Sequence, residues 1–308
     1  MKRFLDCSSS DFSKMTSKEL LESIGKSEGR IIVCETIGIA MPMLGDVTNA
    51  EFVAAMGADI ILLNLFDVNE PVIRGMPEVS PDDTIKEIKR LTGRPIGINL
   101  EPVEQSLSSK EGDNPIWELT EGRKATYENV KKAYEMGTDF IVLTGNPGVG
   151  VNNSAITESI KMIRENFGDN ILIISGKMHG SGILSESGEK IITKEDIFNF
   201  VEAGADIILM PAPGTVPGIT MEYIRELVIY AHNLGVLTLT AIGTSQEGAD
   251  VDTIKEIALM CKMTGTDLHH LGDSGYLGMA LPENILAYGT AIRGIRHTYH
   301  RMALSIKR

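Results

Sequence analysis

The chain has few cysteines, few aromatic residues and no long apolar run. Its three cysteines, Cys7, Cys34 and Cys261, are widely spaced and form no CxxC pair. Such a set supports neither a disulfide framework nor a structural zinc site, and it fits a reducing compartment. No apolar run approaches the roughly 20 residues that span a bilayer, and the start MKRFLDCSSSDFSK has no apolar h-region. We therefore expect a cytoplasmic protein without a membrane partner.

The chain also has fewer basic than acidic residues. The 29 Lys and Arg residues stand against 42 Asp and Glu residues, which gives a formal net charge of −13. Nucleic acids and anionic membranes bind basic surfaces, so the charge argues against both as partners. A small-molecule substrate is the better expectation, and the sequence leaves a homo-oligomer open. With 43% apolar residues, the chain has ample material for a large core.

Four segments repeat one pattern: MGADIILLN at 56–64, MGTDFIVLT at 136–144, AGADIILMP at 203–211 and TGTDLHHLG at 264–272. In each, a helical pattern ends at a glycine, which suits a left-handed helix C-cap. The apolar run that follows is typical of a strand buried on both faces of a parallel sheet. The aspartates of the repeat, Asp59, Asp139, Asp206 and Asp267, begin these strands, and we interpret them as structural.

Four further strand candidates lie between the repeats, and helical stretches separate all eight. These candidates are 30–36, 95–101, 170–177 and 236–242. Strict βα alternation over eight units predicts an α/β protein with a single (βα)8 barrel over residues 30–308. Residues 1–29 precede the first strand. They contain a capping box, Thr16 with Glu19, and we expect that helix to cover the bottom of the barrel.

The connections from strand to helix are long, whereas those from helix to strand are short. Long loops are usually functional, and (βα)8 enzymes place their chemistry at the carboxyl ends of the strands. The long connections are 37–47, 67–80, 102–125, 145–152, 178–192, 211–219, 243–250 and 272–281. The longest contains the single tryptophan, Trp117, and we expect either a lid or a small extra helix there.

Side chains alternate along a strand, so polar residues near a carboxyl end mark the face that points into the barrel. The inward candidates are Glu35, Asn64, Asn99, Glu101, Thr144, Asn146, Ser175, Lys177, His179, Thr240 and Thr244. Alignment of the four repeats puts His270 level with Leu62, Val142 and Leu209. His270 should therefore face the interior and His269 the helices. His270 is either a hydrogen-bonded core histidine or a general acid/base or ligand at the pocket floor.

Lys177 is the most chemically suggestive of these residues. Beside apolar barrel walls it would lose solvation, and its pKa would fall as a Schiff-base or proton-transfer lysine requires. A fixed cation for a substrate anion and a solvated rim lysine are the alternatives. The candidate catalytic residues are Lys177, Glu101, His270, His179 and Glu35.

Four carboxylates fall at strand ends of the same mouth: Glu35, Asp67, Glu101 and Asp273. If two or three of them converged with an asparagine, they would form an oxygen-rich site suited to Mg²⁺ or Mn²⁺. The main hypothesis requires no cofactor, and this metal site is its alternative.

The loops after the seventh and eighth strands, IGTSQEGAD and LGDSGYLGMALPEN, are rich in Gly and Ser/Thr. In such loops the backbone N–H groups can approach a phosphate closely. The candidates for substrate or phosphate binding are Asn64, Asn99, Thr144, Asn146, Gly243, Thr244, Ser245, Gly272, Ser274 and Gly275. Asp273 is the objection, because it puts a negative charge where the phosphate would sit.

These repeats and glycine-rich loops resemble the phosphate-binding (βα)8-barrel superfamily of isomerases, epimerases and aldolases. The segment TNAEFVAAMGADIILLN is distantly similar to the phosphoenolpyruvate mutase/isocitrate lyase group. That group's KKCGH-type cysteine loop is missing, so its chemistry does not carry over. More of the chain looks like a bacterial barrel family labelled phosphonomutase-like or dehalogenase-like. No DxDx(T/V) loop supports the dehalogenase label.

Three functional hypotheses follow. The first is an enzyme of the isomerase, epimerase or aldolase type, a lyase or isomerase acting on a small phosphorylated carbohydrate or keto acid. It would work by proton transfer or C–C bond cleavage. The second is a divalent-metal-dependent lyase or hydrolase. The third is a non-catalytic ligand-binding barrel.

Overall fold

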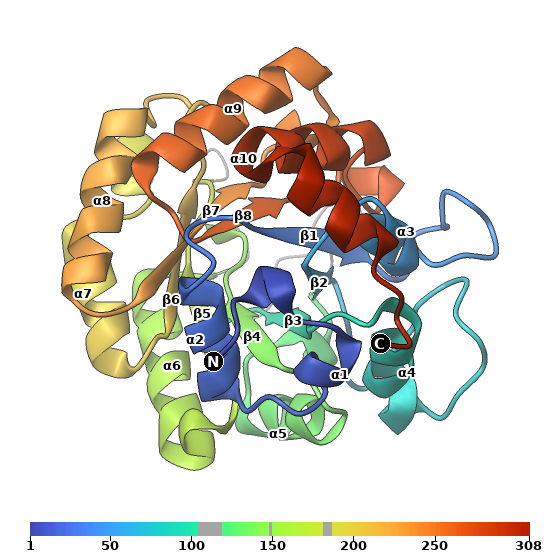
Figure 1. Cartoon of the computed structure of the whole chain (residues 1–308). Coiled ribbons are helices and arrows are strands. Elements are labelled where there is room, and N and C mark those ends of the chain that lie inside the picture. Colours follow the sequence, from blue (N-terminus) through green and yellow to red (C-terminus); the bar gives the residue numbers. More distant parts are fainter. Residues whose placement is uncertain (104–118, 148–149, 181–186) are drawn as a thin grey trace.

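Eight parallel strands close into a barrel in the computed structural model, in sequence order from β1 to β8 (Figure 1). The structure describes residues 1–103, 119–147, 150–180 and 187–308. The strands are β1 (Ile31–Ile37), β2 (Ile60–Asn64), β3 (Ile96–Leu100), β4 (Phe140–Leu143), β5 (Leu172–Gly176), β6 (Ile207–Pro211), β7 (Leu237–Ile242) and β8 (Leu268–Leu271). The predicted (βα)8 barrel is confirmed.

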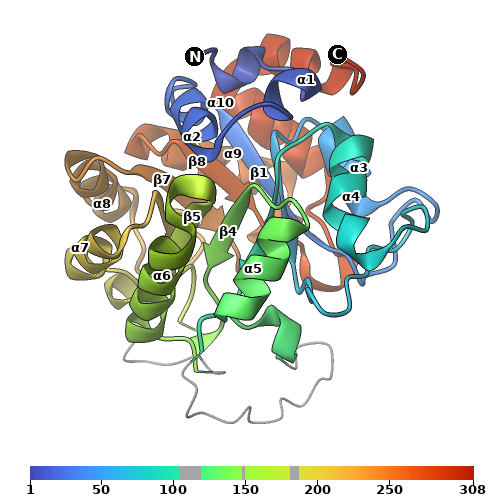
Figure 2. The same ribbon diagram turned by 90° about the horizontal axis from the view of Figure 1, so that it is seen from below.

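Helices surround this barrel and cover the outer faces of the strands (Figures 1 and 2). They are α3 (Asn49–Ala55), α4 (Thr84–Thr92), α5 (Tyr127–Glu135), α6 (Asn153–Phe167), α7 (Lys194–Ala203), α8 (Met221–Asn233), α9 (Val251–Thr264) and α10 (Pro282–Ala303). Most begin at a Thr, Asn or Asp side chain that accepts a backbone N–H of the first turn, as Thr193 does for Asp196. Within α10, Gly294 breaks the helical geometry with a φ of 74°.

The amino-terminal segment contains α1 (Ser9–Phe12) and α2 (Ser17–Gly25). The predicted capping box is present: Thr16 accepts the N–H of Glu19, and the Glu19 carboxylate accepts the N–H of Thr16 at 2.9 Å. Leu20 and Ile24 of α2 pack against interior residues of the barrel such as Phe140. Both termini lie at this end of the molecule (Figure 2).

Two apolar layers hold the barrel together, one inside it and one between strands and helices. Phe140 of β4 fills the interior beside Gly97 of β3, where an added Cβ would come within 2.1 Å of the ring. The outer layer joins alternate strand residues such as Ile61 and Ile98 to the helices. Burial of this much apolar surface is the main stabilising contribution in a fold of this kind.

The four repeated aspartates share one structural role at the amino-terminal end of the barrel. Each carboxylate accepts the backbone N–H of a residue near the start of the preceding strand, and each contacts a basic side chain from the helix layer. The strand N–H groups are those of Ile32, Ile96, Ile173 and Thr238, at 2.8–2.9 Å. The basic partners of Asp59, Asp139, Asp206 and Asp267 are Arg293, Lys89, Arg164 and His232 in that order.

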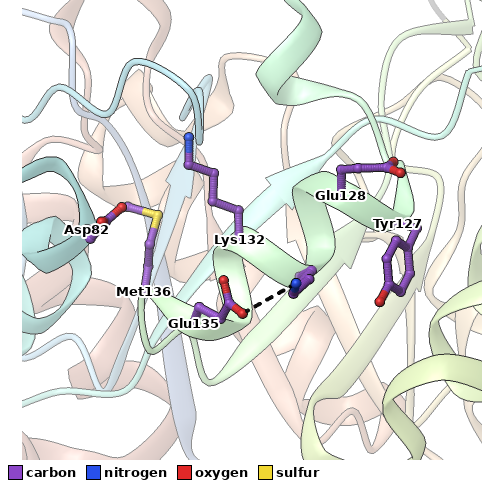
Figure 3. A pocket seen from close by; sticks show the side chains of 7 residues that line it. Asp82, Tyr127, Glu128, Lys132, Glu135 and Met136 are labelled. Carbon is purple, nitrogen blue, oxygen red and sulfur yellow. Dashed lines mark ion pairs between the residues drawn. The ribbon is translucent and has the colours of Figure 1, made fainter.

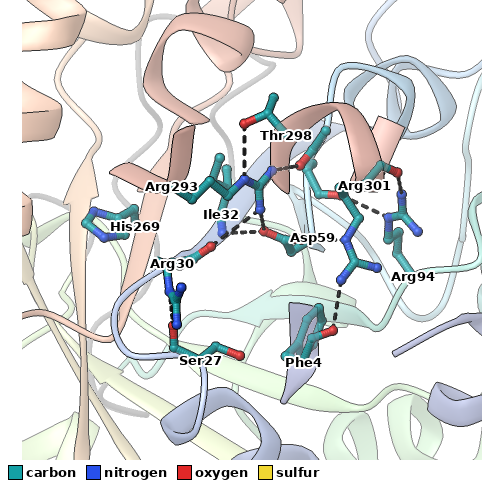
Figure 4. A network of polar contacts seen from close by, with 12 residues as sticks. Phe4, Ser27, Arg30, Ile32, Asp59, Arg94, His269, Arg293, Thr298 and Arg301 are labelled. Carbon is teal, nitrogen blue, oxygen red and sulfur yellow. Dashed lines mark hydrogen bonds and ion pairs between the residues drawn. The ribbon is translucent and has the colours of Figure 1, made fainter. Parts of the chain in front are cut away.

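Asp59 has the most extensive contacts of the four (Figure 4). It is fully buried, it pairs with Arg293, and its Oδ1 lies 2.8 Å from Nε of Arg301. Arg94 donates to the carbonyls of Ala58 and Arg301 nearby. These contacts tie the strand start to the last helix and agree with the structural interpretation of the repeat.

Candidate active site

Four polar side chains form one hydrogen-bonded cluster at the carboxyl ends of β1, β2 and β8. His270 Nε2 lies 2.9 Å from Oε2 of Glu35, and the amide of Asn64 donates to Oε1 of the same carboxyl group at 2.7 Å. That amide also donates to Oδ2 of Asp273 at 3.3 Å. The Asn64 amide therefore joins the carboxyl groups of Glu35 and Asp273. All four residues are candidates from the sequence, and the structure brings them together.

Two neighbouring buried carboxyl groups do not both ionise readily. Burial and the neighbouring Glu35 together raise the pKa of Asp273 to about 8. The pKa of Glu35 is also raised by burial, although its hydrogen bonds oppose that rise. Asp273 therefore carries a proton at neutral pH, and the two groups titrate as a coupled pair.

His270 faces the barrel interior, as the alignment of the repeats predicts. It pairs in register with Val33 of β1 and Ala241 of β7, which both belong to the interior layer. Burial lowers its pKa to about 4, so it is neutral at physiological pH. The Nδ1 atom of His270 is buried and has no hydrogen-bond partner among the described residues.

His269 faces the helices, again as predicted. Its Nδ1 lies 3.0 Å from the hydroxyl of Tyr288, and its Nε2 lies 3.0 Å from the carbonyl of Gly29. Both ring nitrogens have partners, so His269 is a core histidine.

Glu247 is a third carboxyl group at this mouth, and the sequence analysis missed it. It follows β7, it is 4% exposed, and its Oε1 accepts the N–H of Ser274 at 3.2 Å. Gly272 permits this approach, since an added Cβ would lie 3.3 Å from the Glu247 carboxyl carbon. Burial and Asp273 raise the pKa of Glu247. Glu247 lies in a loop, and the alternation of side chains along strands makes no prediction for loop residues.

Strand alternation also gave two wrong predictions. Ser175 pairs with Leu143 and Ile208, and Thr240 pairs with Met210, all of which face the helices. These hydroxyl residues therefore lie in the outer layer, where small polar side chains fit between apolar neighbours. On a strand buried on both faces, a polar residue does not identify the inner face.

On β5 the inward positions belong to Gly176 and Met178. Met178 packs against the interior layer and lies over Gly243, where an added Cβ would meet its sulfur at 2.0 Å. Lys177 is 4% exposed, and it interacts with at least one other group of the protein. His179 is partly buried, and burial lowers its pKa. The catalytic roles predicted for Lys177 and His179 stay predictions.

Glu101 is paired with Arg123 in a buried ion pair, and it lies against Gly145. Burial raises the pKa of Glu101, and Arg123 opposes that rise. Arg123 comes from a short 3-10 turn that the sequence analysis did not single out. The pairing gives Glu101 a structural role beside the predicted proton-transfer role.

The remaining polar candidates of strands β3 and β4 lie near this pair. Asn99 and Thr144 are buried, and Asn146 is exposed. In its hydrogen-bonding orientation, the Asn99 amide donates to the carbonyls of Val142 and Thr144, at 2.9 and 3.2 Å. The inner wall beside the cluster is therefore uncharged and polar.

The carboxylates considered for a metal ion are not all in one place. Glu35 and Asp273 both accept from the Asn64 amide, Glu101 pairs with Arg123, and Asp67 accepts the N–H groups of Asn69 and Glu70. Among the residues that the structure describes, no group of three or more His, Cys, Asp or Glu side chains is arranged to hold a metal ion.

In the loop after β8, the N–H groups considered for a phosphate grip already donate to acceptors within the protein. Gly272 donates to the carbonyl of Ile242 at 2.9 Å, Ser274 to Glu247, and Gly275 to Oδ1 of Asp273 at 2.6 Å. In the loop after β7, the hydroxyl of Thr244 donates to the carbonyl of Thr215 at 2.8 Å. Carboxylates occupy the positions next to the strand-eight loop where a phosphate would accept these bonds.

The backbone is strained around the cluster. Leu65, Ser245 and Ser274 have positive φ values of 54°, 77° and 55°, and they follow the ends of β2, β7 and β8. A non-glycine residue in this conformation costs on the order of 1 kcal/mol or more, and such residues gather at functional sites.

A groove elsewhere in the molecule lies along α5, on the outer helix layer (Figure 3). Asp82, Tyr127, Glu128 and Lys132 are among the residues that line it. It is a charged surface feature away from the strand ends. Trp117 and most of the predicted 102–125 lid lie outside the described residues.

The chain belongs to the family described as "Domain of unknown function (DUF7916)", whose model matches residues 5–308. No curated protein matches it in sequence. No helix of the described part of the chain is long and apolar enough to span a membrane.

Two solved structures illustrate the likeness in fold. One is the carboxyl transferase domain of pyruvate carboxylase from Rhizobium etli, solved with pyruvate, at 12% identity and a TM-score of 0.55. That match covers 96% of this chain and 53% of the other, so this chain spans about half its length. The other is thiamine phosphate pyrophosphorylase from Pyrococcus furiosus, at 12% identity and a TM-score of 0.48, with 86% and 96% coverage. At this identity the likeness to the carboxyl transferase domain supports the barrel fold alone, and the phosphonomutase-like label stays a prediction.

Proposed function

We propose that this protein is a lyase or isomerase that moves protons on a small carbohydrate or keto acid, with Glu35 and Asp273 as its acid/base pair. The observation that carries the proposal is the convergence of these two buried carboxyl groups on the side-chain amide of Asn64, which donates to both. An acid with a pKa near 8 holds its proton at neutral pH and can still release it, as a general acid must.

Each group has a distinct task in this proposal. Glu35, held by His270 and Asn64, takes a proton from the carbon next to a carbonyl group. Asp273 gives its proton to the carbonyl oxygen, which yields an enediol, or to a departing hydroxide, which leaves as water. Glu35 then returns its proton to the neighbouring carbon, Asp273 regains a proton from the second hydroxyl group of the enediol, and the isomerisation is complete. The number of protons on the pair is restored at the end of either cycle.

The substrate class follows from the wall around the pair. Asn64, Asn99 and Thr144 offer neutral donors and acceptors, which suit hydroxyl and carbonyl groups. The proposal leaves out a phosphate at the strand-eight loop, because Glu247 and Asp273 occupy its N–H groups.

Hydrogen exchange tests the proposal directly. The enzyme would be incubated in D₂O with small aldoses, ketoses and keto acids, with and without phosphate groups, and the substrates followed by NMR. We expect deuterium uptake next to a carbonyl group in the wild type, and at least a 100-fold slower rate in Glu35→Gln and Asp273→Asn. Asp46→Asn is the matched control, because Asp46 is an exposed carboxylate of the loop after β1.

Three results would contradict the carboxyl pair. Borohydride trapping of a Schiff base that is lost in Lys177→Ala would assign the chemistry to Lys177. Loss of exchange on treatment with a chelator, restored by Mg²⁺ or Mn²⁺, would favour the metal-dependent alternative. Undiminished exchange in both carboxyl variants would refute the pair as well.

A further inference from the structure

We propose that the loops after β1, β2 and β8 form a self-association surface, through which two copies of this chain pair. Six large apolar side chains of these loops are 40% or more exposed. They are Ile39, Met41, Met43, Leu44, Val72 and Leu277, which together form the apolar loop surface. Met41 is 70% exposed and Leu44 51%. Large contiguous apolar patches on a protein surface mark interaction sites.

The three loops are bonded to one another, so the segments that carry the six side chains adjoin. Arg74, in the loop after β2, donates from Nε to the carbonyl of Ile39 at 2.8 Å. Asn49 at the start of α3 donates to the carbonyl of Leu277 at 3.3 Å. Gly278 packs against Ala40, where an added Cβ would come within 2.6 Å of the alanine side chain. The loops after β1 and β2 extend outward on the α3–α4 side (Figures 1 and 2).

These hydrogen bonds also fix the conformation of the loop after β1 before any partner binds. Asn49 holds the loop after β1 from the other side, since its Oδ1 accepts the N–H of Met43 at 3.1 Å. A preformed loop loses little conformational freedom on binding, so more of its apolar contact area contributes to affinity. Met41 and Met43 add flexible side chains that adapt to an opposing surface.

The charge of the chain points to a second copy as the occupant. Residues 37–45 contain no charged side chain, although the chain carries a net charge of −13. Two identical acidic molecules repel each other unless they meet through uncharged surfaces, and a twofold contact sets the same patch against itself. A basic partner would be drawn to the acidic faces, and an anionic membrane would repel the chain.

The apolar loop surface adjoins the candidate site, because Leu277 lies on the same loop as Asp273. Pairing would therefore take place beside the mouth of the barrel. The inference does not rest on the proposed chemistry, and its test measures mass rather than activity.

Sedimentation velocity over a concentration series, with the full chain, tests the surface. We expect a dimer for the wild type. In Met41→Glu/Leu44→Glu, like charges would meet across the twofold axis, and we expect the dissociation constant to rise about 100-fold or more. The matched control is Leu259→Glu/Met263→Glu on α9, whose side chains are similarly exposed at 49% and 56%. We expect this control to stay dimeric.

Three results would overturn the proposal. The first is a wild type that is monomeric at every concentration, and the second is dissociation of the α9 control to the same extent. The third is a monomer that floats with neutral phosphatidylcholine vesicles through the same residues, which would assign the surface to a membrane. Circular dichroism and thermal unfolding of both double variants verify that they are folded.

Discussion

Carboxyl groups are buried at both ends of this barrel, and their surroundings differ. At the amino-terminal end, each repeated aspartate meets a strand N–H group and a basic side chain, as Asp206 meets Ile173 and Arg164. At the mouth, Glu35, Asp273 and Glu247 lie beside one another and beside a neutral His270.

The difference between the two ends shows what each set contributes. A buried charge is tolerated when a partner of opposite charge and hydrogen bonds accompany it. The aspartates at the bottom meet that condition, and they join strands to helices. The carboxyl groups at the mouth do not meet it, so they keep a proton that can be transferred. We therefore assign stability to the bottom and chemistry to the mouth.

The largest expected effect is a loss of stability at the bottom. Asp59→Ala would leave the N–H of Ile32 and the guanidinium groups of Arg293 and Arg301 without their carboxylate. Removing one partner of a buried ion pair typically costs about 3–5 kcal/mol. Urea unfolding should show a loss of this size, while the folded fraction keeps its activity. A cost below about 1 kcal/mol would contradict the structural role of the repeat.

Asp273→Asn should have the opposite profile. The amide imitates a protonated carboxyl group, so folding is preserved while the transferable proton is lost. We expect the rate of substrate hydrogen exchange to fall by about 100-fold or more, with unfolding free energy at pH 7 equal to or above that of the wild type. If the variant were strongly destabilised and its folded fraction fully active, Asp273 would have a structural role like that of Asp59. The contrast between the two ends of the barrel would then be wrong.

The dependence of stability on pH sharpens the same contrast. Because the folded-state pKa of Asp273 is raised from 3.8 to about 8, its contribution to stability is present in acid. That contribution is lost as the pH rises toward 8, where the folded protein must give up the proton. The wild type should therefore lose about 1–3 kcal/mol relative to Asp273→Asn between pH 5 and pH 9. Parallel pH profiles of the two proteins would argue that no proton is held there.

The smallest effect concerns His232, which takes the place that Lys89, Arg164 or Arg293 has in the other repeats. Its hydrogen bond to Asp267, at 2.8 Å, raises the pKa of His232 above 6.5. The stabilisation is fully present below pH 6.5 and is lost as the pH rises through the raised value. Since the side chain is 38% exposed, we expect only a few tenths of a kcal/mol. His232→Arg should remove this pH dependence in thermal unfolding at pH 6 and pH 8.

The sequence predicted the barrel because repetition made its eight units countable. The same alignment predicted the inward direction of His270 and the structural role of the aspartates. It did not reveal the cations that accompany those aspartates, because they come from helices distant in sequence. Nor did it reveal Glu247, which reaches the mouth from a loop.

The errors for Ser175 and Thr240 have a physical cause. Alternation gives two equivalent faces on a strand buried on both sides, and only a repeat or a contact tells them apart. The sequence likewise could not show that Glu35 and Asp273 are neighbours. Sequence placed both residues at the mouth, and only the structure reveals that the Asn64 amide joins them.

Infrared spectroscopy of the folded protein tests the central claim most directly. A protonated carboxyl group has a C=O stretching band distinct from that of a carboxylate, and it shifts when aspartate is labelled with ¹³C. At pH 7 we predict such a band in the wild type, its loss in Asp273→Asn and its persistence in Asp46→Asn. A wild-type spectrum at pH 7 without a protonated aspartate band would contradict a protonated Asp273 and the acid/base function proposed for it.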